Sequence, residues 1–134
     1  MSLIRKICLG YFVILALVAT LNYIPGLTDA EGRTFGIFAL DIFDDSLHAV
    51  SALWALAAAL VSHRASWIFL TYFGAAYFID GLIGVYAGSG ILDFGIFTYG
   101  ILDQSLIFNI LASLPHLALG GFALMAVWVW GNRT

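Results

Sequence analysis

The chain has 134 residues, of which 63% are hydrophobic and 10% are charged. A soluble domain is roughly half apolar and about a quarter charged, so a soluble globular enzyme is the first class to be excluded. A chain this apolar does not stay solvated as a disordered segment, and a net charge of −3 with five Lys and Arg excludes a basic nucleic-acid-binding surface. The length allows a single domain over residues 1–134.

Four apolar segments follow one another along the chain, at residues 7–24, 41–62, 67–87 and 105–130. About 20 apolar residues are needed to cross the hydrocarbon core of a bilayer. Inside lipid every backbone amide must be hydrogen-bonded, which favours helices. The sequence therefore predicts an all-α integral membrane protein, with four transmembrane helices in an antiparallel bundle.

The first segment follows Arg5 and Lys6, which is also the pattern at the start of a signal peptide. No small-x-small cleavage site follows, so we expect an uncleaved first helix. Pro25 and Gly26 are expected to end it. The single cysteine, Cys8, allows neither an intramolecular disulfide nor a cysteine metal site.

The basic residues are distributed unevenly between the two sides of a four-span arrangement. Arg5, Lys6, Arg64 and Arg133 fall on one side, and Arg33 alone falls on the other. The positive-inside rule then predicts a multi-pass protein of a bacterial inner membrane, with both termini in the cytoplasm. Seven acidic residues map to the outer side: Asp29, Glu31, Asp41, Asp44, Asp45, Asp93 and Asp103.

Two segments of the chain resemble each other. Residues 35–47 read FGIFALDIFDDSL and residues 94–106 read FGIFTYGILDQSL. This internal repeat predicts a duplicated helical hairpin, with a pseudo-twofold axis along the membrane normal. Both copies are unusually apolar for loops, so we expect them to lie in the membrane interface or to cap the bundle, in preference to binding a partner.

Polar residues within the apolar segments mark the places where a site could form. Asp41, Asp44, Asp45 and His48 recur at spacings of three and four residues, which places them on one stripe of the second helix. The stripe continues in small residues, which allow close helix contact in membranes. A matching stripe on the fourth helix consists of Ser105, Asn109, Ala112 and His116, and continues into Gly120 and Ala123.

The two histidines are predicted to reach similar depths, because His48 follows Asp41 by seven residues and His116 follows Asn109 by seven. Asp80, on the third helix, is about seven residues from the outer end of its segment. The sequence therefore allows His48, His116 and Asp80 to meet in one layer.

Three interpretations of this layer remain open. Imidazole and carboxylate suit a divalent metal such as zinc or iron, bound by His48, His116 and Asp80 with Asp44 and Asp45 around them. Two histidines on facing helices could instead hold a haem, or one of them a chlorophyll-type pigment. The third interpretation is structural, with each histidine hydrogen-bonded to an aspartate or to a free carbonyl.

The structural interpretation draws support from Pro115, which removes a helical hydrogen bond and frees the carbonyl of Leu111. Asp80 could alternatively serve a proton or cation conductor, although a conduction path would need more polar residues inside the membrane. His63 is expected to be a solvated residue in a turn spanning residues 63–66. No P-loop, G-x-S-x-G, H-E-x-x-H or cysteine-pair motif is present.

Short motifs along nearly the whole chain resemble a bacterial four-helix integral membrane family, which is described only as a domain of unknown function. They are YIPGLT at residues 23–28, FGIF at 35–38, SLH at 46–48, Asn109, LPHL at 114–117 and Gly120. The resemblance implies a polar tetrad that ends in a histidine near the start of helices two and four, which His48 and His116 match. The residues before the histidine differ between the halves, with Asp44 and Asp45 in the first and Ala112 and Ser113 in the second. The resemblance therefore implies a topology and no activity.

These observations favour a small protein without enzymatic activity, acting as a structural or accessory subunit of a membrane complex or homo-oligomer. The alternative is a protein that binds a haem, pigment or metal through His48 and His116. A proton or cation conductor that uses Asp80 is the third hypothesis.

Overall fold

The computed structural model describes residues 1–133 and is all-helical over that range, without a β-strand. Four helices are long: α1 (Leu3–Val18), α2 (Ile42–Val61), α3 (His63–Ala87) and α5 (Leu106–Trp130). Two are short, the 3-10 helix η1 (Leu21–Tyr23) and α4 (Gly95–Tyr99). Each long helix, α1 being continued by η1, is long and apolar enough to cross a membrane. The four predicted segments are thereby confirmed as helices.

Two helix boundaries differ from the sequence-based prediction. The first helix begins at Leu3, four residues before the predicted start, and its α-helical part already ends at Val18. The third helix begins at His63 instead of residue 67, because Ser62 caps it by accepting a hydrogen bond from the Ala65 backbone N–H (3.0 Å). One residue, Ser62, therefore separates α2 from α3.

His63 is not the solvated turn residue that the sequence led us to expect. Its Nδ1 lies 2.8 Å from the Ser2 hydroxyl, and its Nε2 lies 2.7 Å from the Gly131 carbonyl oxygen. The imidazole thus joins both ends of the chain to the start of α3. These contacts could not be predicted from the sequence, because both partners belong to segments that are remote from His63 in the chain.

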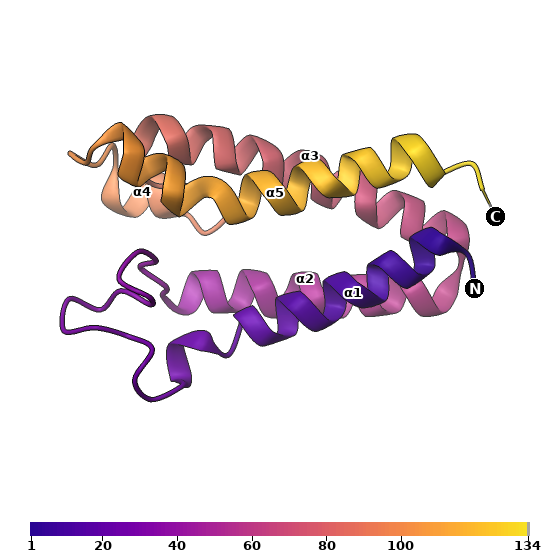
Figure 1. Cartoon of the computed structure of the whole chain (residues 1–134), viewed down its shortest axis with the longest axis horizontal. Helices are drawn as coiled ribbons and strands as arrows, with labels where there is room; N and C mark the ends of the chain where they lie inside the picture. The colour runs from indigo at the N-terminus through magenta and orange to yellow at the C-terminus, as the bar shows by residue number, and fades with distance from the viewer. Residues whose placement is uncertain (134) are drawn as a thin grey trace.

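The two termini and the α2–α3 junction lie at one end of the molecule, which we call the terminal end (Figure 1). The connections at residues 24–41 and 88–105 lie at the opposite end, the loop end (Figure 1). Helix α1 packs mainly against α2, and α3 packs mainly against α5. The bundle therefore consists of two closely packed pairs of helices.

Small residues bring α3 and α5 close together. A Cβ added at Gly120 would lie 2.4 Å from the backbone nitrogen of Phe78 and 2.7 Å from the carbonyl oxygen of Gly74. A Cβ at Gly81 would lie 2.7 Å from the Leu117 side chain. The predicted small-residue stripe of the fourth helix thus packs inside the chain, against a glycine stripe on α3 that the sequence analysis did not identify.

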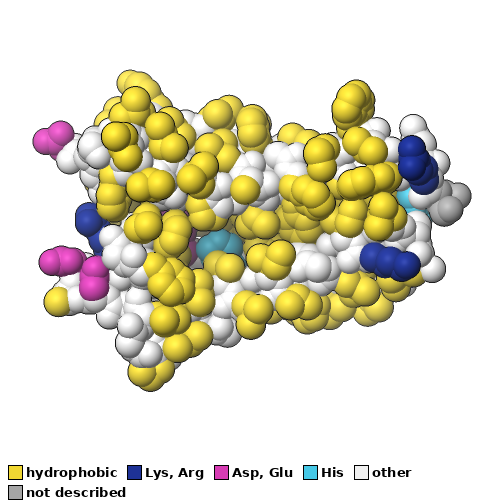
Figure 2. Space-filling view, viewed as in Figure 1, with side chains coloured by type: hydrophobic (Ala, Val, Ile, Leu, Met, Phe, Trp, Pro, Cys, Tyr) yellow, Lys and Arg dark blue, Asp and Glu magenta, His cyan; other side chains and the backbone are white. Residues whose placement is uncertain are grey.

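The surface between the two ends is largely apolar. Leu17, Val50, Tyr72 and Trp128 are among many large apolar side chains that are exposed along the helices. Figure 2 shows this band, with Lys and Arg at the terminal end, and with acidic side chains and a basic one at the loop end. Such a surface is expected for a protein whose sides face lipid.

The two copies of the internal repeat share one backbone feature and differ in another. Phe35 and Phe94, which are equivalent in the repeat, both have a left-handed φ, of 56° and 61°. After Phe94 the chain forms α4, whereas after Phe35 it forms a tight turn that is closed by a bridge between Thr34 and Phe38. The similarity in sequence therefore extends to one conformational detail and not to the whole loop.

Candidate functional site

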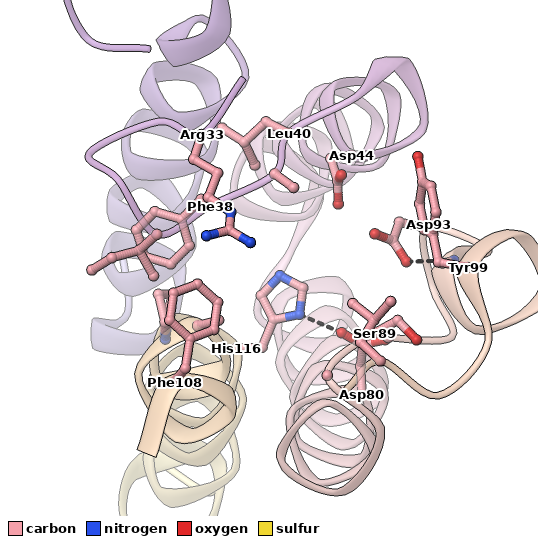
Figure 3. A pocket seen from close by; sticks show the side chains of 18 of the residues that line it. Arg33, Phe38, Leu40, Asp44, Asp80, Ser89, Asp93, Tyr99, Phe108 and His116 are labelled. Atoms are coloured by element: carbon pink, nitrogen blue, oxygen red, sulfur yellow. Dashed lines mark hydrogen bonds and ion pairs between the residues drawn. The ribbon is translucent and has the colours of Figure 1, made fainter. Parts of the chain in front are cut away.

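A cavity of about 260 Å³ lies at the loop end of the molecule. Its walls come from the end of α1, from α2, α3 and α5, and from the two loops (Figure 3). The chemically functional side chains that line it are Arg33, Asp44, His48, Asp80, Ser89, Asp93, Tyr99, Gln104 and His116.

His116 and Asp80 form a pair at the base of this cavity. The Nδ1 of His116 on α5 is hydrogen-bonded to Oδ2 of Asp80 on α3. The other carboxylate oxygen, Oδ1, accepts hydrogen bonds from the backbone N–H groups of Ile91 (2.7 Å) and Leu92 (2.9 Å). Asp80 therefore fixes the His116 ring and also anchors the loop that follows α3.

His48 lies beside this pair, an arrangement that the sequence allowed. The ring centroids of His48 and His116 lie 5.9 Å apart, and Tyr77 lies 4.7 Å from His116. His48 is 4% exposed, yet its Nδ1 has no hydrogen-bond partner. A buried polar atom without a partner is rare and costs free energy, so this nitrogen calls for an explanation.

The two predicted carboxylates on α2 have different surroundings. Asp44 lines the cavity, and its Oδ2 accepts a hydrogen bond from the backbone N–H of Asp41 (3.2 Å). Asp45 is buried outside the cavity lining, and neither of its carboxylate oxygens has a hydrogen-bond partner. Adjacent residues of an α-helix point in directions about 100° apart, and here Asp44 points to the cavity while Asp45 does not.

Five functional residues of the lining were not singled out from the sequence, because all of them lie in the connections between the long helices: Arg33, Ser89, Asp93, Tyr99 and Gln104. Arg33 lies over the ring of Phe108, with 4.9 Å between its guanidinium carbon and the ring centroid. Asp93 accepts a hydrogen bond from the Gly95 backbone N–H (2.9 Å). Tyr99 donates a hydrogen bond to Oδ2 of Asp41 (3.2 Å), and this bond to a carboxylate raises the pKa of the Tyr99 phenol.

The arrangement bears directly on the metal hypothesis. No group of three or more His, Cys, Asp and Glu side chains within residues 1–133 is arranged to hold a metal ion. His116 nevertheless has the orientation that ligating histidines have, with one ring nitrogen hydrogen-bonded to a carboxylate. Its Nε2 is therefore left for a ligand, while Asp80 orients the ring through Nδ1.

Towards the terminal end, the layer of polar side chains ends at Ser51 and Tyr77. The Ser51 hydroxyl lies 3.1 Å from the Tyr77 hydroxyl, and the Tyr77 ring is stacked on Phe73 at 3.9 Å. Phe73, Phe69 and Leu15 beyond it are buried apolar side chains. The cavity thus has a polar base above an apolar core.

Comparison with family models, with curated proteins and with solved structures finds no significant match for this chain.

Proposed function

We propose that the chain is a protein of a bacterial inner membrane that crosses the bilayer four times as an antiparallel bundle, with both termini in the cytoplasm. Its basic residues other than Arg33 gather at the terminal end, and acidic residues gather at the loop end (Figure 2), which supports this orientation. The cavity then opens in the outer half of the membrane.

The function that the geometry supports best is binding of a ligand in this cavity, without enzymatic activity of the chain itself. One observation carries the proposal: His48 and His116 come from different helix pairs and meet at the cavity, where His48 has an unpartnered Nδ1 and His116 is oriented by Asp80. A bound molecule that hydrogen-bonds to His48 would remove the cost of that unpaired nitrogen.

A role as a structural subunit receives less support from the same structure. The small-residue stripes that suggested contacts with other helices pack within the chain, as Gly120 does against Gly74. The exposed apolar loop residues, such as Phe97, remain compatible with a partner or with the membrane interface. An accessory subunit that carries a ligand would unite both hypotheses.

Conduction through Asp80 is the weakest of the three hypotheses. Asp80 is held by His116 and by two backbone amides. The nearest buried side chains beyond Tyr77, those of Phe73 and Phe69, are apolar. A proton path needs a continuous series of polar groups across the membrane. We therefore propose a one-sided binding site in preference to a channel.

The test is to identify what the protein retains when it is purified in mild detergent. Visible absorption detects a haem or pigment, metal analysis detects zinc or iron, and native mass spectrometry detects an organic ligand. The proposal predicts a ligand in the wild type that is lost from His48→Ala and from His116→Ala. His63→Ala is the matched control, because His63 lies at the terminal end, and it should keep the ligand.

Protein that folds and yet carries no ligand by any of the three methods contradicts the proposal. A ligand that survives both substitutions contradicts the assignment of the two histidines. A Soret or pigment band, or stoichiometric metal, would show that the bound ligand is a haem, a pigment or a metal ion.

A further inference from the structure

Side chains of opposite charge line different parts of the cavity. Arg33 comes from the first loop, Asp44 from the start of α2 and Asp93 from the second loop. Figure 3 shows the Arg33 guanidinium on one side and the carboxyl groups of Asp44 and Asp93 on the other. A ligand that fills this space therefore meets a cationic end and an anionic end.

Arg33 is half-buried and makes no ion pair within residues 1–133. Its guanidinium lies over the Phe108 ring, which leaves the five N–H donors for another group. Guanidinium binds phosphate and carboxylate with two parallel hydrogen bonds. An anionic group is therefore expected beside Arg33.

The opposite side of the cavity offers hydrogen-bond acceptors. Asp44 is 6% exposed, and the oxygens of its carboxyl group can accept hydrogen bonds. Asp93 lies in the same part of the cavity, and His48 belongs to the same lining. A primary ammonium group has three N–H donors and matches such a set of acceptors.

The walls of the cavity are apolar, and the cavity reaches the apolar side of the molecule. Val18 and Leu21 from the end of the first span, and Leu119 and Phe108 from α5, belong to its lining. Figure 2 shows a histidine through a gap in this surface, between apolar side chains and away from the charged ends. In a membrane this gap faces acyl chains, so a ligand with a hydrocarbon tail can enter from the side.

We infer, on the basis of the proposed binding function, that the ligand is a phospholipid with a phosphoethanolamine headgroup, taken from the outer leaflet. The phosphate binds Arg33, and the ammonium group binds the side formed by Asp44, Asp93 and His48. The acyl chains leave through the gap between the first span and α5.

Other lipid headgroups match this charge pattern less well. A phosphocholine group has no N–H donor and leaves the acceptors of Asp44 and His48 unsatisfied. A phosphoglycerol group brings a negative charge without a positive one, and it leaves Asp44 and Asp93 without a counter-charge. Discrimination between headgroups is therefore the property that tests the inference.

The experiment is native mass spectrometry of the protein from nanodiscs that contain equal amounts of phosphatidylethanolamine, phosphatidylcholine and phosphatidylglycerol. We expect retention of phosphatidylethanolamine at least ~10-fold above the other two, which corresponds to ~1.4 kcal/mol. Arg33→Gln and Asp93→Asn should each abolish this preference. Arg64→Gln and Glu31→Gln are the matched controls, because Arg64 and Glu31 do not line the cavity.

Four outcomes overturn the inference. Equal retention of the three lipids shows that the cavity does not discriminate between headgroups. Selectivity that is as high in the Arg33 and Asp93 variants as in the wild type shows that other residues discriminate between them. Displacement of the lipid by millimolar free O-phosphoethanolamine, with the free compound then bound, identifies a soluble ligand in place of a lipid. Metal retained in place of lipid identifies a metal site.

The proposed function is tested by a different result, which is whether any ligand depends on His48 and His116. Any ligand that depends on His48 and His116 but lacks headgroup selectivity leaves the proposed function standing and overturns the lipid assignment. Absence of every ligand overturns both.

Discussion

Asp80 and His116 lie 36 residues apart in the sequence and form a buried pair between α3 and α5. Because Asp80 also accepts two backbone hydrogen bonds from residues 91 and 92, the same carboxylate holds a ring and a loop in place. The base of the cavity therefore depends on one side chain.

Substitution of Asp80 should reveal this double role. Asp80→Asn keeps an acceptor for the loop amides but removes the charge that pairs with His116, and we expect a loss of about 2 to 3 kcal/mol in unfolding free energy. His116→Gln should cost a similar amount, and the double variant should cost much less than the sum. Reversible unfolding in mixed micelles, followed by tryptophan fluorescence, measures all three. Additive effects would show that the two side chains do not act as a pair.

The close approach of α3 and α5 predicts a sharp difference between two adjacent glycines. Gly120→Ala places a Cβ against the Phe78 and Gly74 backbones and should destabilise the protein by about 1 to 3 kcal/mol. At Gly121 the nearest atoms lie 3.8 Å away on the Phe78 ring, so Gly121→Ala should be neutral or stabilising by up to about 1 kcal/mol. Thermal unfolding of both variants compares them, and equal stability would contradict the observed packing.

The hydrogen bonds of His63 predict a local effect at both ends of the chain. His63→Ala removes the contacts with Ser2 and Gly131, and we expect it to cost about 2 kcal/mol. Hydrogen exchange should accelerate in residues 1–6 and 128–133, while the exchange at the loop end stays unchanged. Arg64→Ala is the control, because Arg64 is exposed. Unchanged exchange at the termini in His63→Ala would rule out this link.

The contact between Tyr99 and Asp41 predicts a shift in the titration of the phenol. Asp41 raises the pKa of Tyr99 by accepting its hydrogen bond, so Asp41→Asn should lower that pKa towards the ordinary value of about 10. The hydrogen bond stabilises the fold below the unfolded pKa, and this contribution is lost as the pH rises through the folded pKa. Asn also caps helices well, so α2 should be retained. Ultraviolet titration of the variant, with Tyr99→Phe to assign the signal, measures the shift; an unchanged pKa in Asp41→Asn would contradict the contact.

Hydrophobicity and spacing were enough to predict the four helices and to allow His48, His116 and Asp80 in one layer. Apolar runs of about 20 residues identify the spans, and the seven-residue offsets place His48 and His116 at one depth. The proximity of Asp80 followed from its distance to the end of its helix. These features repeat with the helical period, which the sequence displays directly.

The contributions of the loops could not be read in this way. Arg33, Asp93 and Tyr99 reach the cavity from the connections between the long helices, whose path depends on tertiary contacts such as the hydrogen bonds between Asp80 and residues 91 and 92. Asp45 was grouped with Asp44 because both lie near the start of α2. The helical angle between neighbours separates them, and only Asp44 faces the cavity.

The central claim is that the cavity at the loop end holds a ligand, and filling the cavity tests it most directly. Ala112→Phe adds a large side chain to its lining on α5 without altering either histidine, and Ala57→Phe adds the same side chain to a shallow groove on α2. Native mass spectrometry of the wild type and both variants, purified from the same membranes, reports the bound mass. Our account predicts a ligand on the wild type and on Ala57→Phe, and its loss from folded Ala112→Phe. The same ligand retained at full occupancy by Ala112→Phe would contradict the account.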